Sequence, residues 1–315
     1  MSPAPPWQPT APLETLRLRA ELLARIRGFF DSRGVLEVET PVLGQRTVTD
    51  PYIESIRAGN LFLQTSPEYA MKRLLAAGSG PIFQICKAFR AEESGSRHNP
   101  EFTMLEWYRP GFDHHDLMDE VALLLKDVVG AGDAERETYE VVFQRHVGSN
   151  PHEADAAELE RAGSALGVSI ATTSSLSRED WLNLLMAQVI EPKLGQKAPI
   201  FVYDYPADLA ALARIRPGEP PVAERFEVYF RGTELANGYH ELTDAREQRE
   251  RFRRDIEKRR AMGYDDVEPD ERLLRALEAG VPASAGVALG LDRLVMVAAS
   301  ARSLRDVLSF PSDRA

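Results

Sequence analysis

The sequence contains very little cysteine, with one residue, Cys86, among 315. A single thiol excludes a disulfide framework within the chain. Cys86 falls in an apolar stretch with no adjacent helix start or base, so we interpret it as a small core residue and not as a catalytic thiol. The apolar fraction of 43% is sufficient for a sizeable core without disulfides.

Net positive charge and long apolar runs are lacking as well. The chain has 49 acidic and 38 basic residues, a net charge of -11, which argues against broad binding of nucleic acid phosphates but leaves room for a local basic patch. No stretch approaches the roughly 20 apolar residues of a membrane helix. Residues 1–12 are proline-rich and lack the basic start and apolar run of a signal peptide. We therefore expect a soluble, cytoplasmic protein with no membrane partner.

Familiar ligand-binding patterns are also missing. The sequence has no P-loop for phosphate. His114 and His115, followed by Asp116, form a pair of candidate metal ligands, but no third ligand follows at a standard spacing, so we do not predict a zinc site. There is no internal repeat.

The pattern of apolar residues predicts an α+β protein. Residues 1–12 are interpreted as an irregular N-terminal arm and 13–315 as a single catalytic domain, with a helical insertion at about 111–212. Helices are predicted at 13–30, 69–77, 117–129, 153–166, 178–189 and 244–262, and strands at 35–43, 61–65, 201–206 and 222–230.

Residues 83–109 predict two strands joined by a polar loop. In the second strand, Phe102, Met104, Glu106 and Tyr108 alternate and therefore share one face. With Arg90 at the end of the first strand, an arginine, a carboxylate and aromatic rings come together on one sheet surface. This set suits ATP together with an amine, whereas composition alone favours an ordinary hairpin with a polar outer face.

Residues 233–242 allow two interpretations. The spacing of Glu234, Asn237 and Glu241 fits one helix face, but Gly238 weakens a helix. On an extended or bulged strand, the same residues are two carboxylates flanking a bend. Two carboxylates beside a triphosphate are a usual way to place Mg²⁺.

The predicted helix 244–262 carries eight basic and five acidic residues. A solvated face with pairs at i,i+4 spacing explains this composition most simply. A docking surface for an acidic partner, involving Arg253 and Arg254, is the alternative.

Three segments resemble the motifs of the class II aminoacyl-tRNA synthetases. Residues 89–104, Phe-Arg-Ala-Glu followed by Arg-His-Asn-Pro-Glu-Phe-Thr-Met, resemble motif 2 of the lysyl, aspartyl and asparaginyl branch. The helix 13–30, Gly34 and a strand ending in Thr40-Pro41 resemble motif 1, which forms much of the dimer interface in that family. Residues 286–296 resemble motif 3. The resemblance implies the class II catalytic fold, a mainly antiparallel sheet flanked by helices, in a homodimer.

The resemblance also implies an ATP site with Mg²⁺. By position in the motifs, Arg90 and Arg293 are the catalytic residues, on the α-phosphate and the γ-phosphate. Phe102 stacks on adenine. The further residues implied in ATP binding are Ala91, Glu92, Asn99, Glu234, Leu235 and Gly290, and Glu234 and Glu241 are implied as the Mg²⁺ ligands.

A lysine-type substrate is implied by the same comparison. Glu106 and Tyr108 match residues that read a lysine ε-ammonium, and a carboxylate in a partly dry pocket suits that task. Glu68, in Ser66-Pro67-Glu68, matches a residue that holds the α-amino group, although Ser66 and Glu68 also suit a helix start. Asn237, Glu241 and Ala288 complete the implied substrate site.

Only residues 1–12 precede the first predicted helix, so we expect no anticodon-binding barrel and no anticodon recognition. End to end, the chain resembles the lysyl-tRNA-synthetase-like ligases of elongation factor P. That family activates (R)-β-lysine, and less well lysine, as an adenylate and transfers the acyl group to a lysine amine of the factor. Ala288 fits this branch, since lysyl-tRNA synthetases usually have glycine there, whereas Ala70 and Ala91 depart from the histidine and asparagine often found in relatives.

Three other functions stay open from the sequence. A tRNA-charging enzyme is opposed by the expected lack of the barrel and by the acidic balance. A small-molecule amide synthetase conflicts with Glu106 and Tyr108. A non-catalytic regulator is expected to have lost one of the four residues Arg90, Glu234, Glu241 and Arg293, and all four are present.

Overall fold

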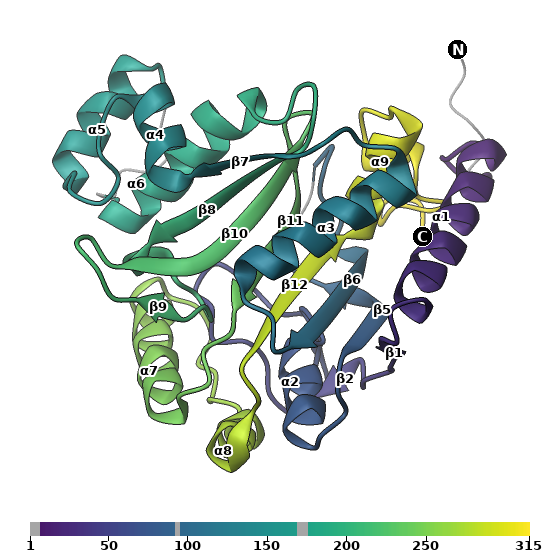
Figure 1. Cartoon of the computed structure of the whole chain (residues 1–315), viewed down its shortest axis with the longest axis horizontal. Coiled ribbons are helices and arrows are strands. Elements are labelled where there is room, and N and C mark those ends of the chain that lie inside the picture. Colours follow the sequence, from purple (N-terminus) through teal and green to yellow (C-terminus); the bar gives the residue numbers. More distant parts are fainter. Residues whose placement is uncertain (1–6, 92–94, 169–175) are drawn as a thin grey trace.

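A computed structural model describes residues 7–91, 95–168 and 176–315 and contains one large mixed sheet (Figure 1). The strand order is β1-β5-β6-β12-β11-β10-β8-β7, with β9 paired to β10. All pairs are antiparallel except β1–β5 and β7–β8. The strands are β1 (Leu36–Glu37), β5 (Ile82–Phe89), β6 (Glu101–Pro110), β7 (Glu135–Thr138), β8 (Ile200–Pro206), β9 (Ile215–Arg216), β10 (Val222–Phe230), β11 (Thr233–His240) and β12 (Ser284–Gly290). The predicted α+β class with a mainly antiparallel sheet is confirmed.

A smaller sheet and a set of helices surround the large sheet. The small sheet has the order β2-β4-β3, with β2 (Leu43–Gly44), β3 (Arg57–Ala58) and β4 (Leu61–Leu63). The α-helices are α1 (Leu13–Asp31), α2 (Glu68–Ala76), α3 (His114–Val129), α4 (Tyr139–Val147), α5 (Ala156–Ala165), α6 (Arg178–Leu185), α7 (Ala245–Ala261), α8 (Glu271–Gly280) and α9 (Leu291–Ala299).

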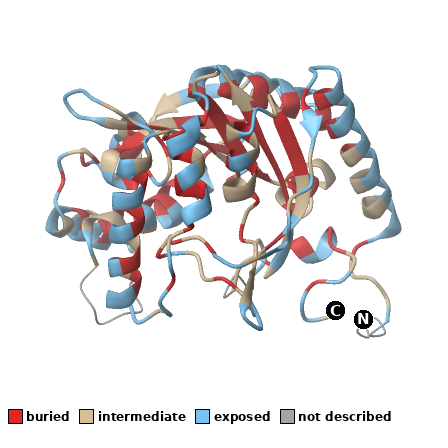
Figure 2. Cartoon of the chain, turned by 90° about the horizontal axis from the view of Figure 1, so that it is seen from below, coloured by how far each residue is buried: buried red, intermediate tan, exposed pale blue. Residues whose placement is uncertain are grey.

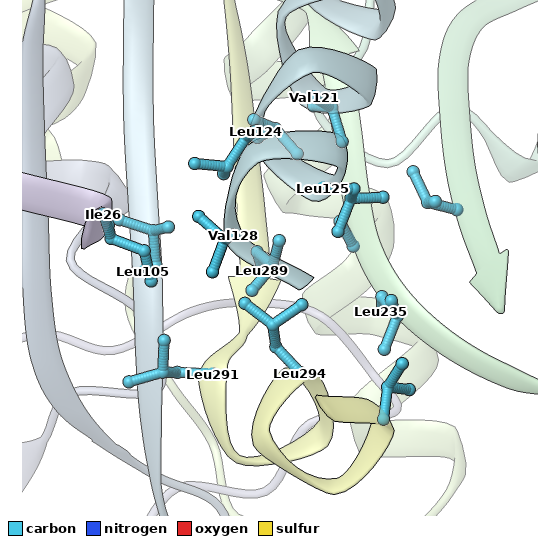
Figure 3. Packing of buried hydrophobic residues seen from close by; sticks show 14 of the residues in the cluster. Ile26, Leu105, Val121, Leu124, Leu125, Val128, Leu235, Leu289, Leu291 and Leu294 are labelled. Atoms are coloured by element: carbon cyan, nitrogen blue, oxygen red, sulfur yellow. The ribbon is translucent and has the colours of Figure 1, made fainter. Parts of the chain in front are cut away.

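The main hydrophobic core lies between the large sheet and helices α1, α3 and α9. Figure 3 shows Leu124 and Val128 of α3 beside Leu289 of β12 and Leu294 of α9. The central strands are largely buried, whereas the helices keep an exposed outer face (Figure 2). Because one face of the sheet is filled by this core, the other face is left to form a site.

The interval 111–212 is helical only in part. Helix α3 packs in the main core, and β7 and β8 extend the large sheet. Helices α4 to α6 gather at the far end of the sheet from α1, around a second core that includes Tyr139, Trp181 and Tyr205 (Figure 1). The spacing of apolar residues predicts a helix at both α3 and α6. It does not show that these helices pack in different cores.

The predicted strand at 35–43 is wrong as a continuous element. Only Leu36–Glu37 and Leu43–Gly44 pair, and they pair in different sheets. Pro41 offers no backbone N–H for a ladder and also restricts Thr40, which explains why the pairing stops. Helices α4 and α8 were not predicted.

Residues 233–240 form a strand, not a helix. β10 and β11 make a hairpin whose turn residues, Arg231 and Gly232, have φ of 53° and 66°. The register shifts between Val228 and Tyr229, so β11 carries a bulge. This confirms the bulged-strand interpretation of 233–242.

Candidate active site

A cavity of about 1220 Å³ opens on the face of the sheet opposite α3. It is lined by β6, β11 and β12, by the start of α2 and by α7. Of the predicted site residues, the cavity brings together Ser66, Glu68, Arg90, Asn99, Phe102, Glu106, Tyr108, Glu234, Leu235, Asn237, Glu241, Ala288, Gly290 and Arg293. Residues from four separate parts of the sequence therefore meet in one place.

Three predicted residues are not in this lining. Pro67 is the N-cap residue of α2, behind Ser66. Ala91 is held through its backbone N–H, which donates to the carbonyl of Glu54 at 2.8 Å. Glu92 lies outside the described residues.

One end of the cavity carries arginines and an aromatic ring. The guanidinium of Arg90 lies 5.1 Å from the centroid of Phe102. Arg293, in the first turn of α9, donates to the carbonyl of Glu234 at 3.0 Å and lies 2.8 Å from His98 Nε2. Fixed positive charges beside a flat ring suit the phosphates and base of a nucleotide.

The motif 3 aspartate, Asp292, has a structural task that the sequence did not reveal. It accepts the N–H of Thr103 at 2.7 Å and pairs with Arg19 of α1 at 2.5 Å. Asp292 is buried, so these bonds join α1, β6 and α9 directly behind Arg293.

The other end of the cavity is acidic. Glu106 accepts hydrogen bonds from Ser66 at 2.8 Å and from Tyr108 at 2.7 Å. Glu68 and Glu241 both pair with the buried Lys72, at 2.7 and 2.6 Å. Two carboxylates therefore share one fixed ammonium group, and Glu106 lies near both of them, so this end carries an excess of two negative charges when all three carboxylates are ionised.

Burial shapes the protonation of this acidic end. It raises the pKa of Glu106 to about 8, with further repulsion from Glu68. Burial also raises the pKa of Glu241 to about 7, although Lys72 opposes the shift. Burial alone lowers the pKa of Lys72, but its two ion pairs raise it, so this ammonium stays charged. The site is poised to receive additional positive charge.

Lys72 is a site residue that the sequence did not reveal. It lies one turn after Glu68 on α2, between Met71 and Arg73. This mixture of apolar and basic residues is typical of an ordinary helix. Its burial, at 2% exposure, is the property that distinguishes it. Lysine is almost never fully buried unless it is paired.

The two predicted Mg²⁺ ligands, Glu234 and Glu241, both line the cavity, and Glu241 pairs with Lys72. Glu234 lies near Glu227 of β10 and Glu191. The role of Glu234 and Glu241 as Mg²⁺ ligands stays a prediction.

Glu227, Glu234 and Glu191 form a carboxylate cluster beside Arg293. Burial and repulsion from Glu227 raise the pKa of Glu234 to about 7, and burial raises the pKa of Glu191. Mutually repelling oxygen ligands of this kind fit a hard cation such as Mg²⁺. The hairpin register, which pairs Tyr229 with Glu234, was the information missing from the sequence.

Ala288 and Gly286 of β12 line the cavity between β6 and β11. Ala288 pairs with Asn237 on one side and with Glu106 on the other, so all three side chains point into the cavity. A Cβ atom on Gly286 would lie 2.3 Å from the ring of Tyr108 and 2.4 Å from Glu241 Oε1. Glycine is required there because these two side chains pass over it.

The basic residues of α7 have mixed roles. Arg251 is buried and donates to the carbonyl of Ala213 at 2.8 Å. Arg259 is also buried, donates to the carbonyl of Asp50 at 2.9 Å and pairs with Glu54 at 2.6 Å. These two arginines anchor loops around the cavity and do not contribute to a solvated face.

The exposed part of α7 follows the simpler interpretation of its charges. Arg253 pairs with Glu250 and Glu257 on its own helix. Arg254 lines the cavity mouth. The i,i+4 interpretation is thus confirmed for Arg253, whereas a docking surface stays a prediction.

Comparison with known proteins defines the class. The family model for class II tRNA synthetases (D, K and N) matches residues 10–314. The chain therefore belongs to this family of class II synthetases, and the resemblance of its motifs is confirmed. Membership implies a ligase that uses ATP.

Particular relatives match over the whole of both chains. The elongation factor P–(R)-β-lysine ligases of Edwardsiella ictaluri and Salmonella dublin are each 51% identical, over 100% of this chain and 100% of theirs. The same holds for the ligase of that name from Salmonella agona. Among the described helices, none combines the length and apolar character needed to cross a bilayer.

Proposed function

We propose that the chain activates (R)-β-lysine, or lysine, with ATP and transfers the acyl group to a lysine side-chain amine of elongation factor P. The observation that carries the proposal is the acidic end of the cavity, where three carboxyl groups accompany one lysine ammonium and, once ionised by ligand binding, can balance a substrate with two ammonium groups. The names and full-length identity of the relatives support the acceptor.

In the first half-reaction, a carboxylate oxygen of the substrate attacks the α-phosphorus of ATP. A P–O bond forms as the bond to pyrophosphate breaks, giving an aminoacyl adenylate. No general base is needed, because the carboxylate is already ionised at neutral pH. The task of the protein is to align the reactants and to stabilise charge on the phosphate oxygens. We assign the α-phosphate to Arg90 and the γ-phosphate to Arg293.

The amine end fixes the orientation of the substrate. One ammonium group binds Glu106, which Ser66 and Tyr108 hold by hydrogen bonds, and the other binds between Glu68 and Glu241. This orientation directs the substrate carboxylate toward Arg90 and Phe102. In the second half-reaction, the acceptor amine attacks the acyl carbon and AMP leaves.

We infer that Mg²⁺ is bound by Glu234 with Glu227 or Glu191. When bound, Mg²⁺ supplies positive charge that neutralises the phosphates. The raised pKa of Glu234 and the crowding of the three carboxylates support this assignment.

An intact-mass assay tests the proposed function. The protein is incubated with ATP, Mg²⁺ and either lysine or (R)-β-lysine, with elongation factor P or a tRNA pool as acceptor. The expected result is the mass gain of one lysyl group on the factor, with tRNA left uncharged. Charged tRNA with an unmodified factor would instead support a tRNA-charging enzyme, and no adenylate at all would support a non-catalytic regulator.

We also propose a homodimer formed through the segment that follows α1. Three large apolar side chains there are unusually exposed, Leu36 at 56%, Val42 at 39% and Leu43 at 46%. Exposed apolar residues that cluster are typical of a protein interface. A cytoplasmic location follows from the proposed acceptor, which is a translation factor.

A further inference from the structure

A second cluster of polar side chains lies on the face of the sheet away from the cavity. Glu241 lines the cavity, and His240 precedes it directly, so His240 points to the opposite face. There it meets Glu224 of β10 and His114 at the start of α3. One ligand atom of each of these three residues lies within 4.8 Å of the other two.

His114 is the unusual member of this cluster. It is 1% exposed, yet within the described part of the chain neither of its ring nitrogens has a hydrogen-bond partner. The nearest carboxylate oxygen, Asp204 Oδ1, lies 3.6 Å away and is also buried without a hydrogen-bond partner. Buried polar atoms are nearly always satisfied, so this long ion pair and the unbonded Nδ1 of His114 require an explanation.

The backbone of β8 is shaped to bring Asp204 to this face. Asp204 has a φ of 57°, which is uncommon for any residue except glycine. The register between β8 and β10 shifts between Ala223 and Phe226, beside Asp204. A bulge at this point re-aims the side chain of Asp204 toward His114 and Glu224.

We propose that this cluster binds one divalent transition-metal ion, with Zn²⁺ as the reference ion. His114, His240 and Glu224 supply three ligands, and Asp204, whose Oδ1 lies 3.6 Å from His114 Nε2, is the adjacent carboxylate that a side-chain shift would bring in as a fourth. Tetrahedral Zn²⁺ with bonds of about 2.0–2.1 Å places its ligand atoms about 3.3 Å apart. Within the triad, His240 Nδ1 lies 2.7 Å from Glu224 Oε2 and all three ligand atoms lie within 4.8 Å of one another, so small side-chain shifts reach that value.

The groups around the cluster support ligation. Arg216 donates to Asp204 Oδ2 at 2.6 Å and lies 3.7 Å from Glu224 Oε1. It therefore occupies the oxygens opposite the ones that face the histidines, as outer partners of metal-binding carboxylates do. The triad is largely buried and lies on the face of the sheet away from the cavity, so an ion bound there would be structural and not catalytic.

Such an ion would join elements that are distant in the sequence. It would tie the first residue of α3 to β10 and β11, behind the strand that carries Asn237 and leads into Glu241. We expect the ion to stabilise the fold and to take no part in the reaction.

Metal analysis of the purified, full-length protein provides the test. After incubation with Zn²⁺ and excess Mg²⁺, followed by dialysis, we expect one equivalent of zinc per chain by elemental analysis. His114→Ala should lose it, whereas His115→Ala, an exposed neighbour on the same helix, should keep it. Substituting Co²⁺ should give the strong visible absorption of a tetrahedral site in the wild type and in His115→Ala only.

A thermal measurement on the unmodified protein covers the case in which His114→Ala does not fold. Zn²⁺ should raise the Tm of metal-free wild type, and EDTA should reverse the rise. Absence of retained zinc and of any Tm shift in the wild type would overturn the proposal. Equal zinc retention by folded His114→Ala and His240→Gln would overturn it too, since the ion would then lie elsewhere.

Discussion

At the scale of single residues, the site depends on charges that burial makes costly. Glu106 is 2% exposed, and burial raises its pKa to about 8. In the free enzyme at pH 7 it is therefore mostly protonated, and an ammonium ligand favours its ionised form. Substrate binding is thus linked to loss of a proton.

Calorimetry in buffers with different ionisation enthalpies measures this linkage. At pH 7 we expect release of roughly one proton from Glu106 and about half a proton from Glu241 per bound lysine, falling toward zero above pH 9, with affinity rising as the pH increases from about 6 to 8. Glu106→Gln should remove the larger part of the release and weaken binding by about 2–3 kcal/mol. Release that persists unchanged in Glu106→Gln would assign the proton to another group.

Substitution of Arg90 is expected to cause the largest loss of catalytic activity. Its removal takes a fixed positive charge from the developing phosphate charge, an effect of about 3–4 kcal/mol for comparable groups. Arg90→Ala should lower ATP–pyrophosphate exchange by about 100-fold or more while the fold is retained. Arg302→Ala, an exposed arginine outside the cavity lining, serves as the control. Near-normal exchange in Arg90→Ala would refute its assignment.

Ala288 is placed to influence the choice of substrate isomer. Its methyl group stands between Asn237 and Glu106, where the position of an amino group is read. Ala288→Gly removes this methyl and should shift the ratio of kcat/KM values toward α-lysine by about 10-fold. This is roughly the discrimination between substrates that one methylene group provides in a pocket. An unchanged ratio in adenylate assays with both isomers would refute this selectivity argument.

At the scale of elements, two arginines on α7 differ sharply in their environment. Arg259 is 2% exposed and holds the loop that contains Asp50 and Glu54, whereas Arg253 makes ion pairs in solvent. Removing the buried arginine leaves Glu54 and two backbone carbonyls without their partner.

Urea unfolding compares these two positions directly. Arg259→Ala should destabilise the protein by about 3 kcal/mol, because two backbone carbonyls and the half-buried Glu54 lose their common partner. Arg253→Ala should cost at most about 1 kcal/mol, since exposed pairs contribute little. Equal losses would mean that the burial of Arg259 does not determine its contribution.

At the scale of the whole molecule, the exposed apolar segment after α1 is the proposed contact between two copies. A charge at the centre of such a contact opposes association, because it has no partner there. Sedimentation of the double variant Leu36→Glu, Leu43→Glu should show a monomer where the wild type is a dimer. Leu123→Glu, on an equally exposed leucine of α3 at 52%, should leave the dimer intact. Dissociation by the control alone would move the interface to α3.

The sequence by itself determined the chemical inventory. The order of Arg90, Phe102, Glu106, Glu234 and Arg293 predicted a nucleotide and an amine, and alternation along 102–108 predicted which side chains share a face. These features are local, because the period of a strand or helix fixes the direction of each side chain relative to its neighbours.

Only the tertiary structure decided which of these groups meet. It placed Glu234 beside Glu227, buried Lys72 between two glutamates, and brought His114 to Glu224 and His240. Spacing in the sequence does not specify which strands become neighbours or where a bulge shifts their register. Those choices follow from long-range packing of the core, so partners across the sheet emerge only in the folded chain.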